Sequence, residues 1–172
     1  MQIIQIHSTS EILDELSELL IDCVESGASV GFLPPLSPEQ AGDYWRQVEG
    51  ELLKGNRNLL VAMEGDKIVG SVQLALCSRA NGSHRAEVEK LMVHRLARGR
   101  GLSKPLMLAL EQLAVGNHRE LLVLDTRLGD VASDLYCKLG YQQAGQIPNY
   151  ARSASGNLET TVYFYKQLKI GH

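Results

Sequence analysis

The chain has 172 residues, a formal net charge of −3 at pH 7 and an ordinary hydrophobic content of 44%. This length allows a substantial core, so we expect one domain spanning residues 1–172. The weak negative charge argues against a nucleic-acid or membrane-surface partner, and no apolar run approaches a membrane span. The first residues lack the basic and apolar regions of a signal peptide.

The three cysteines, Cys23, Cys77 and Cys137, are widely spaced and odd in number. Such a set is typical of free thiols in a reducing compartment, so we expect a cytoplasmic protein. Three histidines lie far apart in the sequence without the spacing of metal ligands: His84, His94 and His118. We therefore expect no metal site.

The N-terminal segment predicts a strand followed by a helix. Residues 2–6 suit a short strand, and an apolar stripe at helical spacing predicts a helix over residues 9–25. Ser8 and Glu11 have the spacing of a capping box at its start.

The next segment, residues 26–36, is glycine-rich and apolar and ends in two prolines. It predicts a loop that either packs on the core or lines a pocket with Val30 and Phe32. A second helix begins at Pro38 and ends near Gly55.

Three antiparallel strands follow, over residues 58–63, over residues 68–77 and from Arg85 onward. A helix over about residues 102–116 separates them from a short apolar strand, residues 121–125. A strand, a helix and a further strand favour a parallel crossover.

The C-terminal segment predicts a helix over residues 130–139 and a closing hairpin. The hairpin strands are residues 141–144 and 161–165, with a long loop over residues 146–158. The whole order, β-α-α-β-β-β-α-β-α-β-β, predicts a mixed α/β (α+β) protein with about seven strands.

The segment from Ala86 to Met107 predicts an anion site. It has a strand, two glycines at Gly99 and Gly101, and a helix with Pro105 in its first turn. Bare backbone N–H groups at a helix N-terminus bind phosphate well. The P-loop pattern is absent, and Lys104 excludes the dinucleotide pattern.

The pattern Arg98-x-x-Gly101-x-Ser103 after Leu-Met-Val resembles the pyrophosphate loop of the GNAT superfamily of acyl-CoA N-acyltransferases. Ser103 departs from the family's Gly or Ala. The resemblance implies acetyl-CoA as co-substrate and a mixed, mostly antiparallel twisted sheet with helices on both faces and one parallel strand pair at the CoA cleft. The CoA contacts it implies are Leu91, Met92, Val93, Arg98, Gly99, Arg100, Gly101, Leu102, Ser103 and Lys104.

Acetyl transfer to an amine needs a base, and three carboxylates are candidates. Glu87 and Glu89 lie on the strand before the glycine turn, and Asp125 ends the next strand. Strand alternation predicts one shared face for Glu87, Glu89, Leu91 and Val93. The choice between Glu87 and Asp125 stays open, with Glu89 a weaker candidate. A carboxylate needs desolvation, or a bridging water, to act near neutral pH.

The stretch from Ala132 to Tyr141 resembles the C-terminal GNAT motif, which implies that Tyr136 protonates the CoA sulfur. Gly129 stands where the family often has an Asn that contacts CoA, so Asp130 or Ser133 is the substitute we expect. A backbone N–H around Met92 or Val93 is the expected oxyanion donor.

The acceptor site leaves less trace in the sequence. By position, the candidate contacts are Val30, Phe32, Tyr44, Trp45, Asn149 and Tyr150. Trp45 also suits a core position.

Three further stretches, 27–32, 81–88 and 156–158, resemble one GNAT branch, the tabtoxin-resistance acetyltransferases. This implies a small-molecule acceptor and a role in toxin or antibiotic resistance. A peptide or protein N-acetyltransferase and a non-enzymatic CoA sensor are the alternatives. The apolar final strand is compatible with a homodimer.

Overall fold

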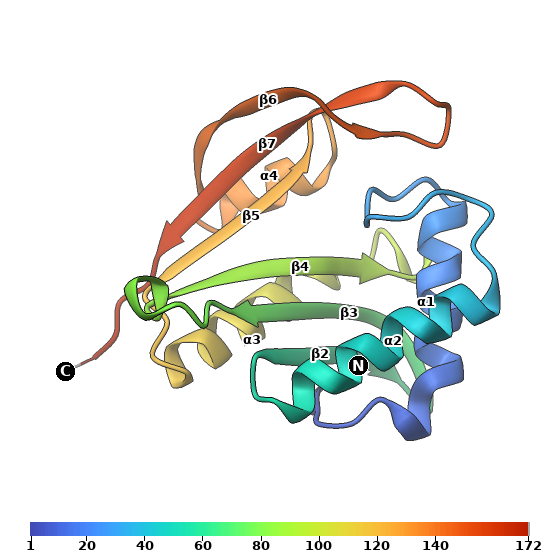
Figure 1. Ribbon diagram of the computed structural model, residues 1–172, viewed down its shortest axis with the longest axis horizontal. Helices are drawn as coiled ribbons and strands as arrows, with labels where there is room; N and C mark the ends of the chain where they lie inside the picture. Colours follow the sequence, from blue (N-terminus) through green and yellow to red (C-terminus); the bar gives the residue numbers. More distant parts are fainter. Residues whose placement is uncertain (172) are drawn as a thin grey trace.

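The computed structural model describes residues 1–171 and has one seven-stranded sheet (Figure 1). The strands are β1 (Gln2–Ile6), β2 (Arg57–Glu64), β3 (Lys67–Leu76), β4 (Arg85–Val93), β5 (Leu121–Arg127), β6 (Gln142–Arg152) and β7 (Leu158–Gln167). The helices are α1 (Leu13–Glu25), α2 (Pro38–Leu53), α3 (Ser103–Gly116) and α4 (Ala132–Lys138). The predicted element order and mixed α/β class are confirmed.

The strands run in the order β1-β2-β3-β4-β5-β7-β6, and β4 and β5 form the parallel pair. Helices α1 and α2 cover one face of the sheet, and α3 and α4 cover the other (Figure 1). Strand alternation builds both cores, since Leu59 packs with α1 and α2 while Leu60 packs with α3. None of the helices among residues 1–171 has the length and apolarity to span a membrane.

Strands β4 and β5 pair only over their first residues. The ladder joins Arg85, Ala86 and Glu87 to residues 121–123, and β5 continues beyond it along β7. Figure 1 shows β4 and β5 diverging toward their C-terminal ends. The backbone of β4 past Glu87 therefore faces an opening on its β5 side.

A β-bulge interrupts β4 at Lys90 and Leu91. Ser71 pairs with Met92 and Gln73 with Glu89, so one residue of β3 faces two residues of β4. Lys90 has a positive φ of 51°. The predicted shared face of Glu87, Glu89, Leu91 and Val93 is wrong, because the bulge reverses the alternation.

After the bulge, Leu91 packs against the α3 core together with Val88, while Met92 belongs to the core of α1 and α2. Glu87 and Glu89 flank Val88 in the strand, so their side chains point to the opposite face of the sheet, toward α1 and α2.

Two predicted local structures are wrong. The Ser8–Glu11 capping box does not form: residues 10–12 make a 3₁₀ turn whose N-cap, Thr9, has no side-chain cap. Ser8 Oγ instead donates to Glu49 Oε1 of α2 at 2.8 Å, and the Thr9 backbone N–H donates to the same carboxylate. A tertiary partner outcompetes the local one.

The predicted loop over residues 146–158 is also wrong. Strand β6 continues to Arg152 and pairs with β7, which leaves residues 153–157 as the turn. A register shift between Ile147 and Ala151 accommodates Pro148 and Asn149, and Asn149 has a φ of 54°. The irregular composition thus marks a bulged strand.

Candidate active site

A cleft of about 540 Å³ opens where β4 and β5 diverge. One wall comes from the end of α1 and residues 26–30, and the other from the end of β5 and the start of α4. Between them lie β4 and the turn that leads into α3. Predicted residues that line it are Leu91, Met92, Val93, Arg98, Gly99, Gly101, Leu102, Ser103, Lys104, Asp125 and Tyr136.

The turn before α3 has the features of a diphosphate site. Gly99 and Gly101 have φ values of 76° and 75°, which side chains on Cβ disfavour. Leu102, the N-cap of α3, makes no side-chain cap, so the first N–H groups of the helix have no such partner. Lys104 adds a positive charge at the cleft. These groups fit the diphosphate of a CoA molecule.

The three arginines of this turn bind protein groups. Arg98 Nε donates to the Val93 carbonyl at 2.9 Å. Arg100 Nη1 pairs with Glu64 at 3.0 Å, and Arg95 binds Asp22. Arg100 is absent from the cleft wall, so its predicted CoA contact is not supported by the geometry. The arginines brace the turn.

A second cavity of about 310 Å³ adjoins the cleft. The two share the residues at the divergence point, including Val30, Lys90, Asp125 and Arg127. The rest of the smaller cavity is polar and comes from β4, β6, β7 and the α1–α2 loop. It includes Glu87, Glu89, Tyr150, Glu159, Thr160 and Thr161, and Ser29 of the loop lines both spaces.

The three candidate bases have different surroundings. Glu89 is ion-paired, since Arg57 Nη1 lies 2.6 Å from Glu89 Oε2. Asp125 Oδ2 accepts a 2.7 Å hydrogen bond from Thr161 Oγ1. Glu87 has no ion-pair partner among residues 1–171. Partial desolvation, and then the nearby charges of Glu89 and Asp125, raise the pKa of Glu87.

Tyr136 of α4 is 5% exposed and lines the cleft. Its ring packs 5.8 Å, centroid to centroid, from both Tyr141 and Phe164. Burial raises the pKa of its phenol above the usual value. Of the two substitutes for the missing Asn, Asp130 lines the cleft and Ser133 does not.

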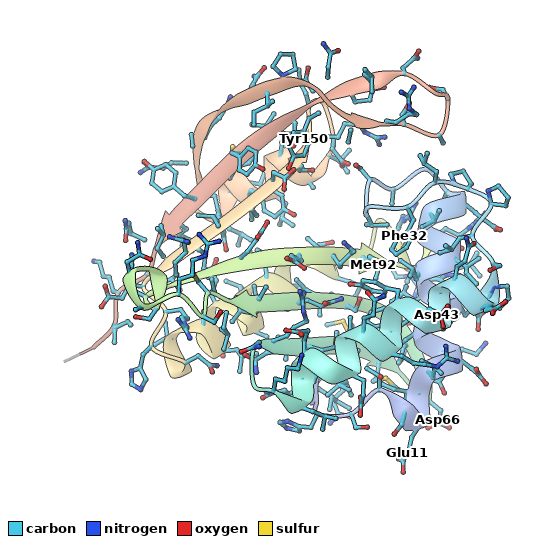
Figure 2. The ribbon with its side chains drawn as sticks, viewed as in Figure 1. Glu11, Phe32, Asp43, Asp66, Met92 and Tyr150 are labelled. Carbon is cyan, nitrogen blue, oxygen red and sulfur yellow. The ribbon has the colours of Figure 1, made fainter. Side chains whose placement is uncertain are left out.

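The predicted acceptor contacts are divided between the cavity and the core. Val30 and Tyr150 line the smaller cavity, and the Tyr150 hydroxyl lies 2.8 Å from that of Tyr163. The ring of Phe32 meets that of Tyr44 edge to face, with centroids 5.3 Å apart, and Phe32 lines an adjoining depression. Figure 2 shows Tyr150 on the β6–β7 side and Phe32 on the α1–α2 side of the opening.

Three predicted contacts lie elsewhere. Trp45 is fully buried in the core of α1 and α2, and Asn149 is exposed on β6 and absent from both cavity walls. Tyr44 is tied to the core side by a 2.9 Å hydrogen bond from Gln73 Nε2 and also lies outside both walls.

Sequence reasoning missed Lys90 and Arg127, which line both cavities. Arg127 ends β5, and strand ends are common places for binding groups, so its position carried a usable signal. Lys90 carried none, because the bulge that places it depends on pairing with β3.

Residues 13–141 match the Acetyltransferase (GNAT) family. Over 117 residues the chain is 32% identical to the "Uncharacterized N-acetyltransferase in hisH-hisA intergenic region" of Azospirillum brasilense, covering 67% of this chain and 68% of that protein.

Two solved structures share the fold. Ribosomal-protein-alanine N-acetyltransferase of Brucella melitensis has a TM-score of 0.80 at 21% identity, covering 96% of this chain and 99% of that one. The yncA protein of Salmonella typhimurium, solved with its cofactor acetyl-CoA, has a TM-score of 0.81 at 18% identity, covering 98% and 95%.

Proposed function

The chain belongs to the GNAT acetyltransferase family, with acetyl-CoA as co-substrate, and we propose that it acetylates an amine of a small polar molecule. The observation that carries this proposal is the cavity of about 310 Å³ beside the CoA cleft, which several charged and hydroxyl side chains line. Its walls include the α1–α2 loop and the β6–β7 hairpin, so the space suits a small molecule.

Glu87 is the proton acceptor in this proposal. Acetyl-CoA supplies an acetyl group activated as a thioester. The raised pKa of Glu87 makes its carboxylate a stronger base than an ordinary one, and it lines the acceptor cavity. Asp125, held by Thr161, lies where the cleft and the cavity meet and orients the amine.

Tyr136 is the proton donor. Tyr136 lines the cleft, and its phenol carries a proton at neutral pH because even an ordinary tyrosine has a pKa of about 10. It can therefore donate a proton to the leaving sulfur. The backbone of Leu91 to Val93, past the end of the β4–β5 ladder, supplies N–H groups for the carbonyl oxygen.

The acceptor cavity carries both signs of charge. Glu87, Asp125 and Glu159 favour a cationic amine, while Lys90 and Arg127 have no carboxylate partner within 4 Å among residues 1–171. This mixture suits a small polar acceptor. It agrees with the sequence resemblance to tabtoxin-resistance acetyltransferases, which modify a small β-lactam amino acid, and supports a role in detoxification.

The test is thiol release from acetyl-CoA with a panel of amines, amino-acid analogues and short peptides. We expect turnover with small amines, and a fall in kcat of at least about tenfold in Tyr136→Phe with little change in KM. Tyr141→Phe is the matched control, since its ring packs in the same aromatic cluster but outside the cleft wall.

Two outcomes would contradict the proposal. Turnover confined to peptides would assign a peptide or protein amine as acceptor. Binding of acetyl-CoA without turnover on any amine, together with equal behaviour of both variants, would favour a CoA-binding sensor.

A further inference from the structure

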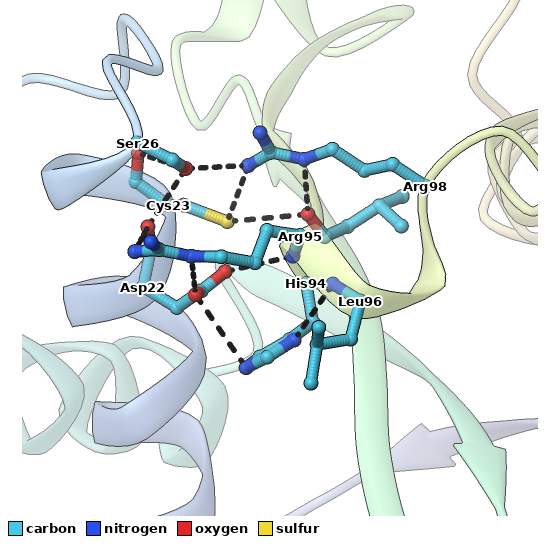
Figure 3. A network of polar contacts seen from close by, with 8 residues as sticks. Asp22, Cys23, Ser26, His94, Arg95, Leu96 and Arg98 are labelled. Carbon is cyan, nitrogen blue, oxygen red and sulfur yellow. Dashed lines mark hydrogen bonds and ion pairs between the residues drawn. The ribbon is translucent and has the colours of Figure 1, made fainter.

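A polar network joins the last turns of α1 to the segment between β4 and α3 (Figure 3). Its centre is Asp22, whose side chain is only 9% exposed. Asp22 Oδ2 accepts from the Arg95 backbone N–H at 2.8 Å, and Oδ1 accepts from Arg95 Nε. His94 Nε2 lies 3.5 Å from the same Oδ1. One carboxylate thus contacts two consecutive residues of the segment.

A second set of contacts involves Arg98. Its Nη2 donates to Ser26 Oγ at 2.8 Å, and Ser26 Oγ donates in turn to the Asp22 carbonyl at 2.8 Å. Cys23 Sγ donates to the Val93 carbonyl, which also accepts from Arg98 Nε. Figure 3 shows both sets converging on one turn of α1.

The network contacts the segment between β4 and α3, which has left the sheet. The last contact of this segment with β3 is the hydrogen bond from the His94 N–H to the Val69 carbonyl, at 2.9 Å. A short 3₁₀ helix follows at Arg95–Ala97, and α3 starts at Ser103. The intervening turn contains Gly99 and Gly101, which restrict the backbone least. Its course therefore depends on side-chain anchors.

We propose that Asp22 is a positioning residue for acetyl-CoA. By fixing His94 and Arg95 against α1, it sets the course of the chain that delivers the backbone N–H groups of the glycine turn and of α3 to the diphosphate. Asp22 itself is absent from the cleft wall. Its role belongs to acetyl-CoA binding and does not depend on the acceptor.

The test is a double-mutant cycle read by calorimetric titration of acetyl-CoA, which requires no acceptor. We expect Asp22→Asn and Arg95→Ala each to raise the Kd for acetyl-CoA about tenfold. The double variant is expected to be little worse than either single one, because both changes remove the same contact. Glu25→Gln, an exposed change on the same helix, is the matched control and should leave Kd unchanged.

A kinetic readout separates positioning from general damage. With any acceptor that turns over, Asp22→Asn should raise the KM for acetyl-CoA while kcat at saturation stays within about twofold. Thermal unfolding of each variant shows whether the protein remains folded under assay conditions.

Three results would overturn the proposal. These are an unchanged Kd in folded Asp22→Asn, additive losses in the cycle, or a fall in kcat with an unchanged KM. If the wild-type protein bound no acetyl-CoA, the proposed function would fail as well. Acetyl-CoA binding without turnover would contradict only the proposed function.

Discussion

At the scale of single residues, Glu87 and Glu89 show how neighbours on one strand face acquire different chemistry. Glu89 is neutralised by Arg57, which lies 32 positions away in the chain. Partial desolvation, and then the like charges of Glu89 and Asp125, outweigh the cations near Glu87, so the pKa of Glu87 is raised. The same residue type therefore provides one structural ion pair and one candidate base.

Replacing Glu87 by Gln should lower kcat/KM at least about tenfold, because the proton acceptor is lost. The base form of Glu87 requires deprotonation, and its pKa is raised from the ordinary carboxyl value of 4.5. Activity of the wild type should therefore fall on the acid side at a higher pH than an ordinary carboxylate would cause. The pH dependence of kcat/KM measures this.

Glu159→Gln is the control for charge, since Glu159 lines the same cavity. In Glu159→Gln, kcat/KM should fall at acid pH as it does in the wild type, whereas in Glu87→Gln this fall should be absent. If kcat/KM of Glu87→Gln still fell at acid pH as in the wild type, the base would be another group, with Asp125 the next candidate.

At the scale of elements, β3, its neighbouring strand β4 and helix α3 pack closely together beside the cleft. Gly70 of β3 pairs with Val93, and a Cβ on Gly70 would lie 3.0 Å from the Met92 carbonyl oxygen and 3.2 Å from Leu106 Cδ1. The carbonyl belongs to the sheet and cannot move freely. Position 70 therefore requires a glycine because neighbouring atoms lie too close for a side chain, and not because its φ is unusual.

Gly70→Ala should destabilise the protein by about 1–3 kcal/mol, because the extra methyl group overpacks this contact. Urea unfolding measures the change. Gly116→Ala is the control, since nothing lies within 4 Å of a Cβ there at the end of α3. We expect that control to be neutral or stabilising by about 0.5 kcal/mol. Equal stabilities of the two variants would contradict the packing argument.

At the scale of the whole molecule, the sheet consists of two parts joined weakly. Strands β1 to β4 and strands β5 to β7 meet through three residue pairs of the β4–β5 ladder. The cleft lies between the two parts, and its walls come from both. We therefore expect acetyl-CoA bound in the cleft to contact both parts and to stabilise the arrangement as a whole.

Acetyl-CoA at about one hundred times its Kd should stabilise the folded state by about 2.7 kcal/mol. For a chain of this size the corresponding rise in Tm is about 5–11 °C. Thermal unfolding with and without acetyl-CoA measures it, with ATP at the same concentration as a control that lacks the pantetheine arm. A rise of equal size with ATP would place the binding energy in the phosphates alone.

Local patterns in the sequence predicted most of the fold and part of the site. Hydrophobic periodicity located each helix and strand, and the glycines at 99 and 101 marked the turn before α3. The Ser8 capping box failed because Glu49, from another element, takes its donors. Trp45 was misplaced as an acceptor contact because an aromatic side chain has the same local pattern in a core as in a pocket.

The sequence by itself determined the order of elements, the mixed sheet and the family, because these depend on periodicity and on contiguous motifs. Only the tertiary structure decided which residues share a face around Lys90, since that depends on a bulge against β3. It also brought Asp22 to Arg95, across 73 positions. Contacts between distant segments arise from packing of whole elements, and no local pattern encodes them.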